Sequence, residues 1–335
     1  MTLTGYTRRV VLTCLSALLV GLPTASCGLL NGPSNEGGGN ANTHQLEKPT
    51  ITVGVMQTID TAPFFLALKR GYFRDEGLTV QVKPVQGGAE SVPLLTGEHI
   101  DVGFGNWATL LQAQAHHSAE YRIVADGDQG RSHVMIVAVR PDSSIKTPAD
   151  LVDKTVSTNT PDDVPLLALR AILRADNLDF NRVHTTTVHH ADTPTALANK
   201  AVDAAIQLEP FITKAREQTG TEAVVDLFGP GPTQDLPLAG YFSLASFVQK
   251  SPKSAAAFQR ALQRGAADAA DEQAVRQILP DYTGIDRDTA MLVTIPTFPT
   301  SLSATRLQRV ADLMTTYGQL TDKIDVGPLV FTPAS

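Results

Sequence analysis

The chain has 335 residues, of which 42% are hydrophobic and 18% are charged, and its formal net charge is −7. This length and composition indicate a globular protein of about two domains, not a disordered or fibrous one. Because no run of lysine or arginine follows the N-terminal segment, nucleic acid is not an expected partner.

The N-terminal segment has the pattern of an export signal. Arg8 and Arg9 precede an apolar run over residues 10–22, and small residues then lead to Cys27. The run is short for a bilayer core of about 30 Å, so residues 1–26 are predicted to be a cleaved signal and not a membrane anchor. The end of this segment resembles a bacterial lipoprotein signal, in which Cys27 would be lipidated. Thr24 departs from the aliphatic residue that is usual three positions before that cysteine. "TRRVVL" fits either a twin-arginine or an ordinary secretory signal.

Residues 27–48 are predicted to form a flexible tether, because they are rich in Gly, Asn and Ser. Cys14 lies in the predicted signal, so the mature chain would keep Cys27 alone and could form no internal disulfide. We therefore expect an exported, lipid-anchored protein on the outer face of the bacterial cell membrane, or a periplasmic one, that is stabilised by a large core.

The folded part is expected to begin with a strand–helix–strand unit. Alternating apolar residues predict strands over 51–55 and 78–82. Between them a helix is expected to start at Pro63 and to end at Gly71 in a left-handed conformation. Such a unit predicts a parallel pair of strands joined by a crossover helix.

Similar strand and helix patterns alternate along the rest of the chain, which predicts an α/β architecture. Pro93 is expected to limit a helix in 89–98 to its first turns. "LTGEHID" and "LANKAVD", which end at Asp101 and Asp203, are a possible internal repeat. Further predictions are a strand over 241–250 and helices over 251–272 and 303–320.

Several segments together resemble one known family. They are "APFFLALKRGYFRDEGLTVQV", "QGG", "LTGEHIDVGFGN", "DLVDKTVST", "VDAAIQLEP" and "LQRVADLMTTYGQL". In this order they are similar to the periplasmic substrate-binding proteins of ABC transporters for nitrate, sulfonates, taurine and thiamine precursors. That group is itself similar to the yeast thiamine-pyrimidine synthase.

The resemblance implies a two-lobed periplasmic-binding-protein fold of type II, with two parallel-rich mixed sheets joined by two crossing strands. Lobe 1 would contain residues 49–138 and 240–335, and lobe 2 residues 139–239. It also implies a monomer that closes on a small organic ligand in the cleft and delivers it to an ABC permease. The ligand would be similar to a sulfonate or taurine, to nitrate, or to a thiamine pyrimidine.

Candidate ligand-binding residues follow the ends of predicted strands, where open α/β sheets bind ligands. They are Thr58, Asp60, Pro63, Gly87, Gly88, Asn106, Trp107, Arg131, Ser157, Thr158, Asn159, Glu209 and Pro210. Gly87 and Gly88 form either an anion-binding loop or a plain turn. Trp107 is either a cleft wall or a core residue. Arg131 is either a ligand donor or an exposed loop residue, and Glu209 either binds an amine or caps a helix.

The predicted cleft rim is acidic, with Asp60, Asp126, Asp128 and Glu209, which favours a zwitterion, an amine or a heterocycle over a bare dianion. No cofactor or metal site is expected, since the paired histidines lack the partners of a metal site. An enzyme similar to the thiamine-pyrimidine synthase is disfavoured, because that branch carries a cysteine-rich motif and the folded part has no cysteine. A ligand-sensing domain for a membrane receptor remains an alternative.

Overall fold

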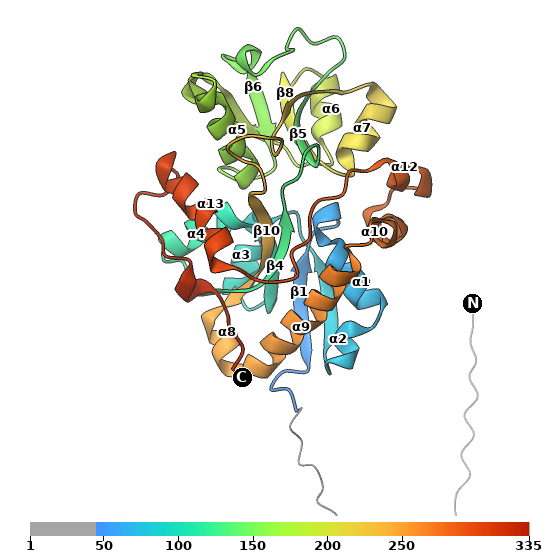
Figure 1. Cartoon of the computed structure of the whole chain (residues 1–335), viewed down its shortest axis with the longest axis vertical. Helices are drawn as coiled ribbons and strands as arrows, with labels where there is room; N and C mark the ends of the chain where they lie inside the picture. Colours follow the sequence, from blue (N-terminus) through green and yellow to red (C-terminus); the bar gives the residue numbers. More distant parts are fainter. Residues whose placement is uncertain (1–44, 335) are drawn as a thin grey trace, which may run out of the picture. The chain divides into compact units, whose positions relative to one another are not determined.

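The computed structural model describes residues 45–334, which contain two five-stranded mixed sheets (Figure 1). The first has the strand order β2-β1-β3-β10-β4 and the second β7-β6-β8-β5-β9. The strands are β1 Thr50–Val55, β2 Thr79–Pro84, β3 Val102–Asn106, β4 Tyr121–Gln129, β5 Met135–Val139, β6 Thr155–Thr158, β7 His184–Thr187, β8 Ala204–Leu208, β9 Glu222–Asp226 and β10 Pro237–Leu244.

Helices accompany both sheets, and Figure 1 shows α5, α6 and α7 beside strands of the second. The α-helices are α1 Ala62–Lys69, α2 Tyr72–Asp75, α3 Gly88–Thr96, α4 Trp107–Ala115, α5 Val164–Ala175, α6 Thr193–Ala198, α7 Phe211–Thr219, α8 Ala245–Lys250, α9 Pro252–Asp268, α10 Glu272–Ile278, α11 Pro280–Thr283, α12 Arg287–Leu292 and α13 Ala304–Thr316. Four 3₁₀ turns are η1 Ile59–Thr61, η2 Pro148–Leu151, η3 Phe180–Arg182 and η4 Gly327–Leu329.

The chain passes between the sheets twice, which confirms the predicted fold class. It leaves the first sheet after β4 and returns with β10, and the two links meet where the Gly130 N–H donates to the Leu236 carbonyl. The predicted boundary at residue 138 falls inside β5, a strand of the second sheet. The boundary at residue 240 falls inside β10, which pairs antiparallel with β3 and β4 of the first. Because β5 begins at Met135 and β10 at Pro237, the chain crosses between the sheets slightly before residues 138 and 240.

The first unit has the predicted order, with β1 and β2 parallel and α1 between them. Gly71 has φ +77°, the left-handed conformation expected after the helix. Two other expectations are wrong. Helix α3 continues through Pro93 to Thr96. The apolar segment 241–250 is not one strand, because β10 ends at Leu244 and α8 follows.

The predicted internal repeat is present at hydrogen-bond level. Asp101 accepts from the Thr52 N–H of β1, and Asp203 accepts from the Thr155 N–H of β6, each at 2.9 Å. In return the aspartate N–H donates to the carbonyl of the same threonine. The units β1–β2–β3 and β6–β7–β8 are therefore equivalent, with β1 and β6 as central parallel strands.

The last residues of the predicted tether are bound to the fold. The Glu47 carboxylate accepts from the Lys253 and Ser254 N–H groups at the start of α9, and Lys48 pairs with Asp101 at 2.6 Å. The predicted signal, Cys27 and most of the tether lie outside the described residues. Within residues 45–334, no helix is long and apolar enough to cross a membrane.

Candidate ligand-binding cleft

A cavity of about 50 Å³ lies between the two sheets, at the loops that follow their strands. Both halves of the fold contribute to its wall, which contains Met56, Asp60, Gly87, Gly88, Phe104, Asn106, Met135, Asn159, Thr160, Asp163, Pro165, His190, Leu208, Leu238 and Ala239. None of these described lining residues is a lysine or an arginine. The cavity therefore combines apolar side chains with carboxylate, amide and backbone groups.

Five predicted site residues meet at this cavity: Asp60, Gly87, Gly88, Asn106 and Asn159. They come from the ends of β1, β2, β3 and β6, as the strand-end rule predicts. Asn106 also caps α4, because its side-chain oxygen accepts from the Thr109 N–H at 3.0 Å.

Asn159 links the two halves of the cavity wall. Its Nδ2 donates to the Gln86 carbonyl at 3.1 Å, and its Oδ1 accepts from the His190 N–H at 3.3 Å. Gly87 lies opposite, and a Cβ on it would be 3.3 Å from the Asn159 Nδ2. The loops after β2 and β6 are thus in contact, and the cleft is closed.

Gly87 and Gly88 each have a backbone reason to be glycine. Gly87 has φ +154°, a conformation that side chains disfavour. Gly88 packs against α4 and β3, and a Cβ built on it would be 3.1 Å from the Thr109 Cγ2 and 3.4 Å from the Gly105 Cα. The pair is therefore a tight turn at the start of α3 that also lines the cavity.

Asp163 is a lining carboxylate that the sequence analysis missed. Its oxygens accept from the Leu166 N–H at 2.9 Å and from the Thr158 hydroxyl at 2.6 Å. It caps α5 in this way, and the sequence signal was its place just before Val164 and Pro165. Burial raises its pKa to about 6, although these hydrogen bonds favour the charged form.

His190, also missed, lies at the cavity as a neutral base. Burial lowers the pKa of its imidazole to about 3, and the neighbouring His189 contributes in the same direction. Its ring stacks near Phe211, with centroids 6.0 Å apart. His190 therefore offers a neutral ring to a ligand and no positive charge.

Asp60 lies at the cavity in a different electrostatic setting. It is 8% exposed, and burial raises the pKa of its carboxyl to about 7. Asp128 on β4 is fully buried, and no hydrogen bond within 3.5 Å reaches its carboxylate oxygens among the described residues, although the Ala239 and Asp128 N–H groups lie close enough to favour its charged form. Burial and the charge of Asp60 raise the pKa of Asp128 well above its usual value. The two carboxyls therefore interact.

Four other predicted residues are buried in strands or helices and do not line the cavity. Trp107 is 1% exposed in the core, where a side chain at Gly240 would collide with its ring. Pro63 is buried in α1, with its carbonyl against Gly265 of α9. Ser157 and Thr158 are buried in β6, and the Thr158 hydroxyl serves Asp163. The sequence analysis left the first of these, Trp107, open between wall and core.

Thr58 is close to the cavity without lining it. Its carbonyl accepts from the Tyr282 hydroxyl at 3.1 Å and from the Thr61 N–H at 3.3 Å. Its own hydroxyl oxygen is buried close to the Asp60 carboxyl and favours the charged form of that group, without a hydrogen bond within 3.5 Å among residues 45–334. Thr58 therefore shapes the turn that carries Asp60.

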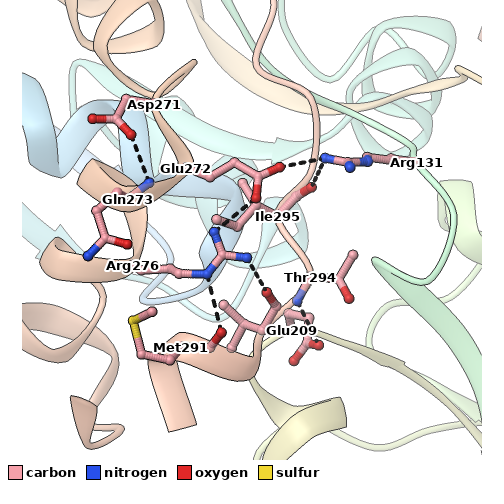
Figure 2. Close-up of polar contacts among 10 residues, drawn as sticks. Arg131, Glu209, Asp271, Glu272, Gln273, Arg276, Met291, Thr294 and Ile295 are labelled. Atoms are coloured by element: carbon pink, nitrogen blue, oxygen red, sulfur yellow. Dashed lines mark hydrogen bonds and ion pairs between the residues drawn. The ribbon is translucent and has the colours of Figure 1, made fainter. Parts of the chain in front are cut away.

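Arg131 and Glu209 belong to a separate polar cluster (Figure 2). Arg131 donates to Glu272 of α10 at 2.8 Å and to the Ile295 carbonyl at 3.4 Å. Glu209 accepts from the Thr294 N–H at 3.2 Å. Arg131 lies in the link after β4 and Glu209 directly after β8, so both connect the segment around α10–α12 to the part of the fold that holds the second sheet.

Glu209 also caps α7, since its carboxylate accepts from the Thr213 N–H and hydroxyl. These bonds support the capping alternative of the sequence analysis over a ligand amine. Pro210, which follows a cis peptide bond, lies directly before α7. Neither residue lines the cavity.

Comparison with known proteins agrees with this geometry. The pattern of the family described as NMT1/THI5 like matches residues 58–274. The chain belongs to this family. No curated protein matches the sequence.

Solved structures share the fold at low sequence identity. The periplasmic aliphatic sulphonate binding protein SsuA from Escherichia coli is 19% identical, with a TM-score of 0.65 over 83% of this chain and 95% of that one. The alkanesulfonate-binding protein SsuA from Xanthomonas axonopodis pv. citri, bound to MOPS, is 16% identical, with a TM-score of 0.71 over 84% of this chain and 98% of that one. The periplasmic nitrate-binding protein NrtA from Synechocystis PCC 6803 is 16% identical, with a TM-score of 0.67 over 83% of this chain and 84% of that one.

Metal binding receives no support from the described residues. Among residues 45–334, no three or more His, Cys, Asp or Glu side chains are grouped so that they could hold a metal ion. The site is thus best described as a closed cleft between two α/β lobes.

Proposed function

We propose that this protein is an extracytoplasmic solute-binding protein that captures a small organic ligand and delivers it to an ABC permease. The cavity carries the proposal, because residues from both lobes line it at the carboxyl ends of their parallel strands. A ligand held there would contact both lobes at once and so favour the closed arrangement.

Membership of the NMT1/THI5-like family and the fold shared with sulfonate- and nitrate-binding proteins support this function. The ligand classes under the proposal are sulfonates and taurine, nitrate, and thiamine-type pyrimidines. The protein would act as a monomer, anchored through a lipid on Cys27 at the outer face of the membrane. A ligand-sensing role for a membrane receptor would use the same cleft.

Thermal unfolding with a solute panel tests the binding function. Taurine, alkanesulfonates, nitrate, bicarbonate and thiamine-pathway pyrimidines would each be added to the purified protein. A solute at a hundredfold excess over its dissociation constant stabilises the native state by about 2.7 kcal/mol. We expect at least one class to raise the unfolding midpoint, and no shift with any class would contradict the proposal.

Two variants of lobe 2 localise the binding. Asn159→Ala removes the amide that joins the cavity wall to Gln86, so it should weaken the effect of the binding solute. Asn181→Ala changes an exposed asparagine of η3 and serves as the matched control. Equal shifts in the two variants would place the solute elsewhere.

The lipid anchor has its own test. Radiolabelled palmitate should be incorporated into the wild-type protein in bacterial cells and not into Cys27→Ala. Equal labelling of both would contradict the anchor and leave the cleft proposal unaffected.

A further inference from the structure

The two lobes place an aspartate at the same point of the repeat. Val53 pairs with Val102 and Val156 with Ala204, so the two valines are equivalent. Asp60 and Asp163 each follow their valine by seven residues. Both line the cavity, one from each lobe.

Only one of these two carboxylates caps a helix. Asp163 accepts from the Leu166 N–H in the first turn of α5, from the Thr160 N–H before the helix and from the Thr158 hydroxyl. Asp60 does not cap α1, whose N-cap residue is Thr61 and makes no side-chain capping bond. The Asp60 carboxylate has the Thr58 side chain and its own backbone N–H as hydrogen-bonding neighbours, and it keeps further acceptor capacity for a ligand in the cavity.

Asp128 adds a second carboxylate beside Asp60. It is fully buried on β4, which packs against η1, and no hydrogen bond within 3.5 Å reaches its oxygens in residues 45–334, although the Ala239 and Asp128 N–H groups favour its charged form. Burying a carboxylate with so little hydrogen bonding is unfavourable. Such a group is retained where a cation can approach or where it holds a proton.

The surrounding groups supply no positive charge to this pair. The Tyr241 hydroxyl on β10 is buried and has no hydrogen-bond partner in the described part of the chain; burial raises its pKa, and the charges of Asp128 and Asp60 contribute. The Tyr282 hydroxyl of α11 donates to the Thr58 carbonyl, and the charge of Asp60 likewise helps to raise its pKa.

The arginine that pairs with β4 does so through a different aspartate. Arg306 of α13 forms an ion pair with Asp126, the next carboxylate along β4. Even with this partner, burial raises the pKa of Asp126 to about 6. Across the cavity stand Asp163, which is acidic, and His190, which is neutral.

We propose that Asp60, supported by Asp128, binds the cationic group of the solute. The ligand is then an organic cation, or a zwitterion with an ammonium or amidinium group, and not a bare anion. This inference rests on the proposed solute-binding function. Asn106 and Asn159 offer amide groups to the remainder of the ligand, and Met56 and Phe104 offer apolar surface.

The charge of the pair sets the expected pH dependence. A cation binds the ionised carboxylate, and protonation competes with it below the pKa of Asp60, which is about 7. Affinity should therefore rise as the pH rises through about 7. An anion that used a protonated carboxyl as its donor would show the opposite trend.

Matched probes test the proposal by thermal unfolding and calorimetry. Taurine would be compared with isethionate, which has a hydroxyl in place of the ammonium, and putrescine with 1,4-butanediol. Agmatine would extend the amine set. We expect an amine member to bind at about pH 8, its hydroxyl counterpart not to bind, and the amine to bind more weakly at about pH 5.5.

Two variants assign the effect to the carboxylate. Asp60→Asn should weaken the amine probe roughly thirtyfold or more, as expected when one partner of a buried charge pair is removed. Asp322→Asn removes an exposed carboxylate far along the chain and should leave the affinity unchanged.

The outcomes separate this inference from the function on which it rests. Binding of isethionate, nitrate or diol as tightly as the amines would overturn the cation site and leave the solute-binding function intact. So would amine binding that strengthens as the pH falls or that survives Asp60→Asn. Failure of every probe of either kind to bind would contradict both proposals.

Discussion

The two lobes repeat one construction and use it differently at the cleft. Asp101 and Asp203 make the same hydrogen bonds to the first strand of each unit, so the scaffolds are closely alike. At the equivalent positions further along, Asp163 caps a helix, whereas Asp60 caps none and lies near the buried Asp128. A repeated scaffold can thus keep its structural aspartates while its two cavity carboxylates differ in what they bind.

The largest expected effect is the dependence of the free energy of unfolding on the ionisation of Asp60, the buried carboxyl in lobe 1. The pKa of Asp60 is raised from 3.8 to about 7, so the folded protein holds a proton that the unfolded chain releases. The free energy of unfolding should therefore fall as the pH rises from about 4 to about 7, by on the order of 4 kcal/mol from this group. Urea unfolding across this pH range measures it.

Asp60→Asn removes that titrating group and should flatten the fall, and it should stabilise the protein above about pH 7. Asp322→Asn, an exposed change of the same charge, should leave the slope unaltered. A fall that persists undiminished in Asp60→Asn would mean that the raised pKa belongs to other carboxyls.

The next effect tests the cap in lobe 2. Asn can replace Asp163 as the cap of α5, but Ala cannot, and Ala also leaves the Leu166 N–H and the Thr158 hydroxyl without their acceptor. Asp163→Ala should therefore be less stable than Asp163→Asn by about 1–2 kcal/mol in urea unfolding. At position 60 the Ala and Asn variants should differ less, and an equal difference at both positions would remove the contrast between the lobes.

A smaller effect tests the shared scaffold. Asp101→Ala and Asp203→Ala each leave one strand N–H, of Thr52 or Thr155, without its acceptor. Each should lower the free energy of unfolding by about 1 kcal/mol or somewhat more, and by similar amounts. Loss of stability in one variant alone would show that the repeat is not energetically symmetric.

The smallest effect concerns the turn before α3. Gly87→Ala places a Cβ at φ +154° and 3.3 Å from the Asn159 Nδ2. We expect a loss of about 1 kcal/mol in stability and a weaker closed state, seen as a lower affinity for the binding solute. Gly231→Ala is a useful comparison, since Gly231 has φ +149° and nothing within 4 Å of its Cβ. If both variants bind the solute as the wild type does, contact between the loops does not govern closure.

Alternation and capping predicted the α/β architecture, because they are local signals that the sheets preserve, whereas the two-lobed arrangement came from the resemblance to a known family. Its errors were local as well. The apolar run after Gly240 has no periodicity that separates the end of β10 from α8. Pro93 was expected to stop α3, yet the helix continues to Thr96.

Within the site, the strand-end rule found Asp60, Asn106 and Asn159, because position along a strand places residues at one edge of a sheet. It also selected Trp107, since the rule cannot tell on which side of the backbone a residue packs. Arg131 bonds to Glu272, a partner 141 residues away that no local pattern indicates. The same limit hid how little hydrogen bonding the buried Asp128 carboxylate has within residues 45–334.

Proton exchange on binding tests the cleft and its unequal carboxylates most directly. Calorimetric titration of the binding solute in buffers of different ionisation enthalpy, near pH 7, gives the number of protons released or taken up. A cation at Asp60 displaces a proton from the carboxyl pair, so release of up to about one proton is expected, and little in Asp60→Asn. Uptake of a proton, or the same release in wild type and variant, would contradict a ligand cation bound at Asp60.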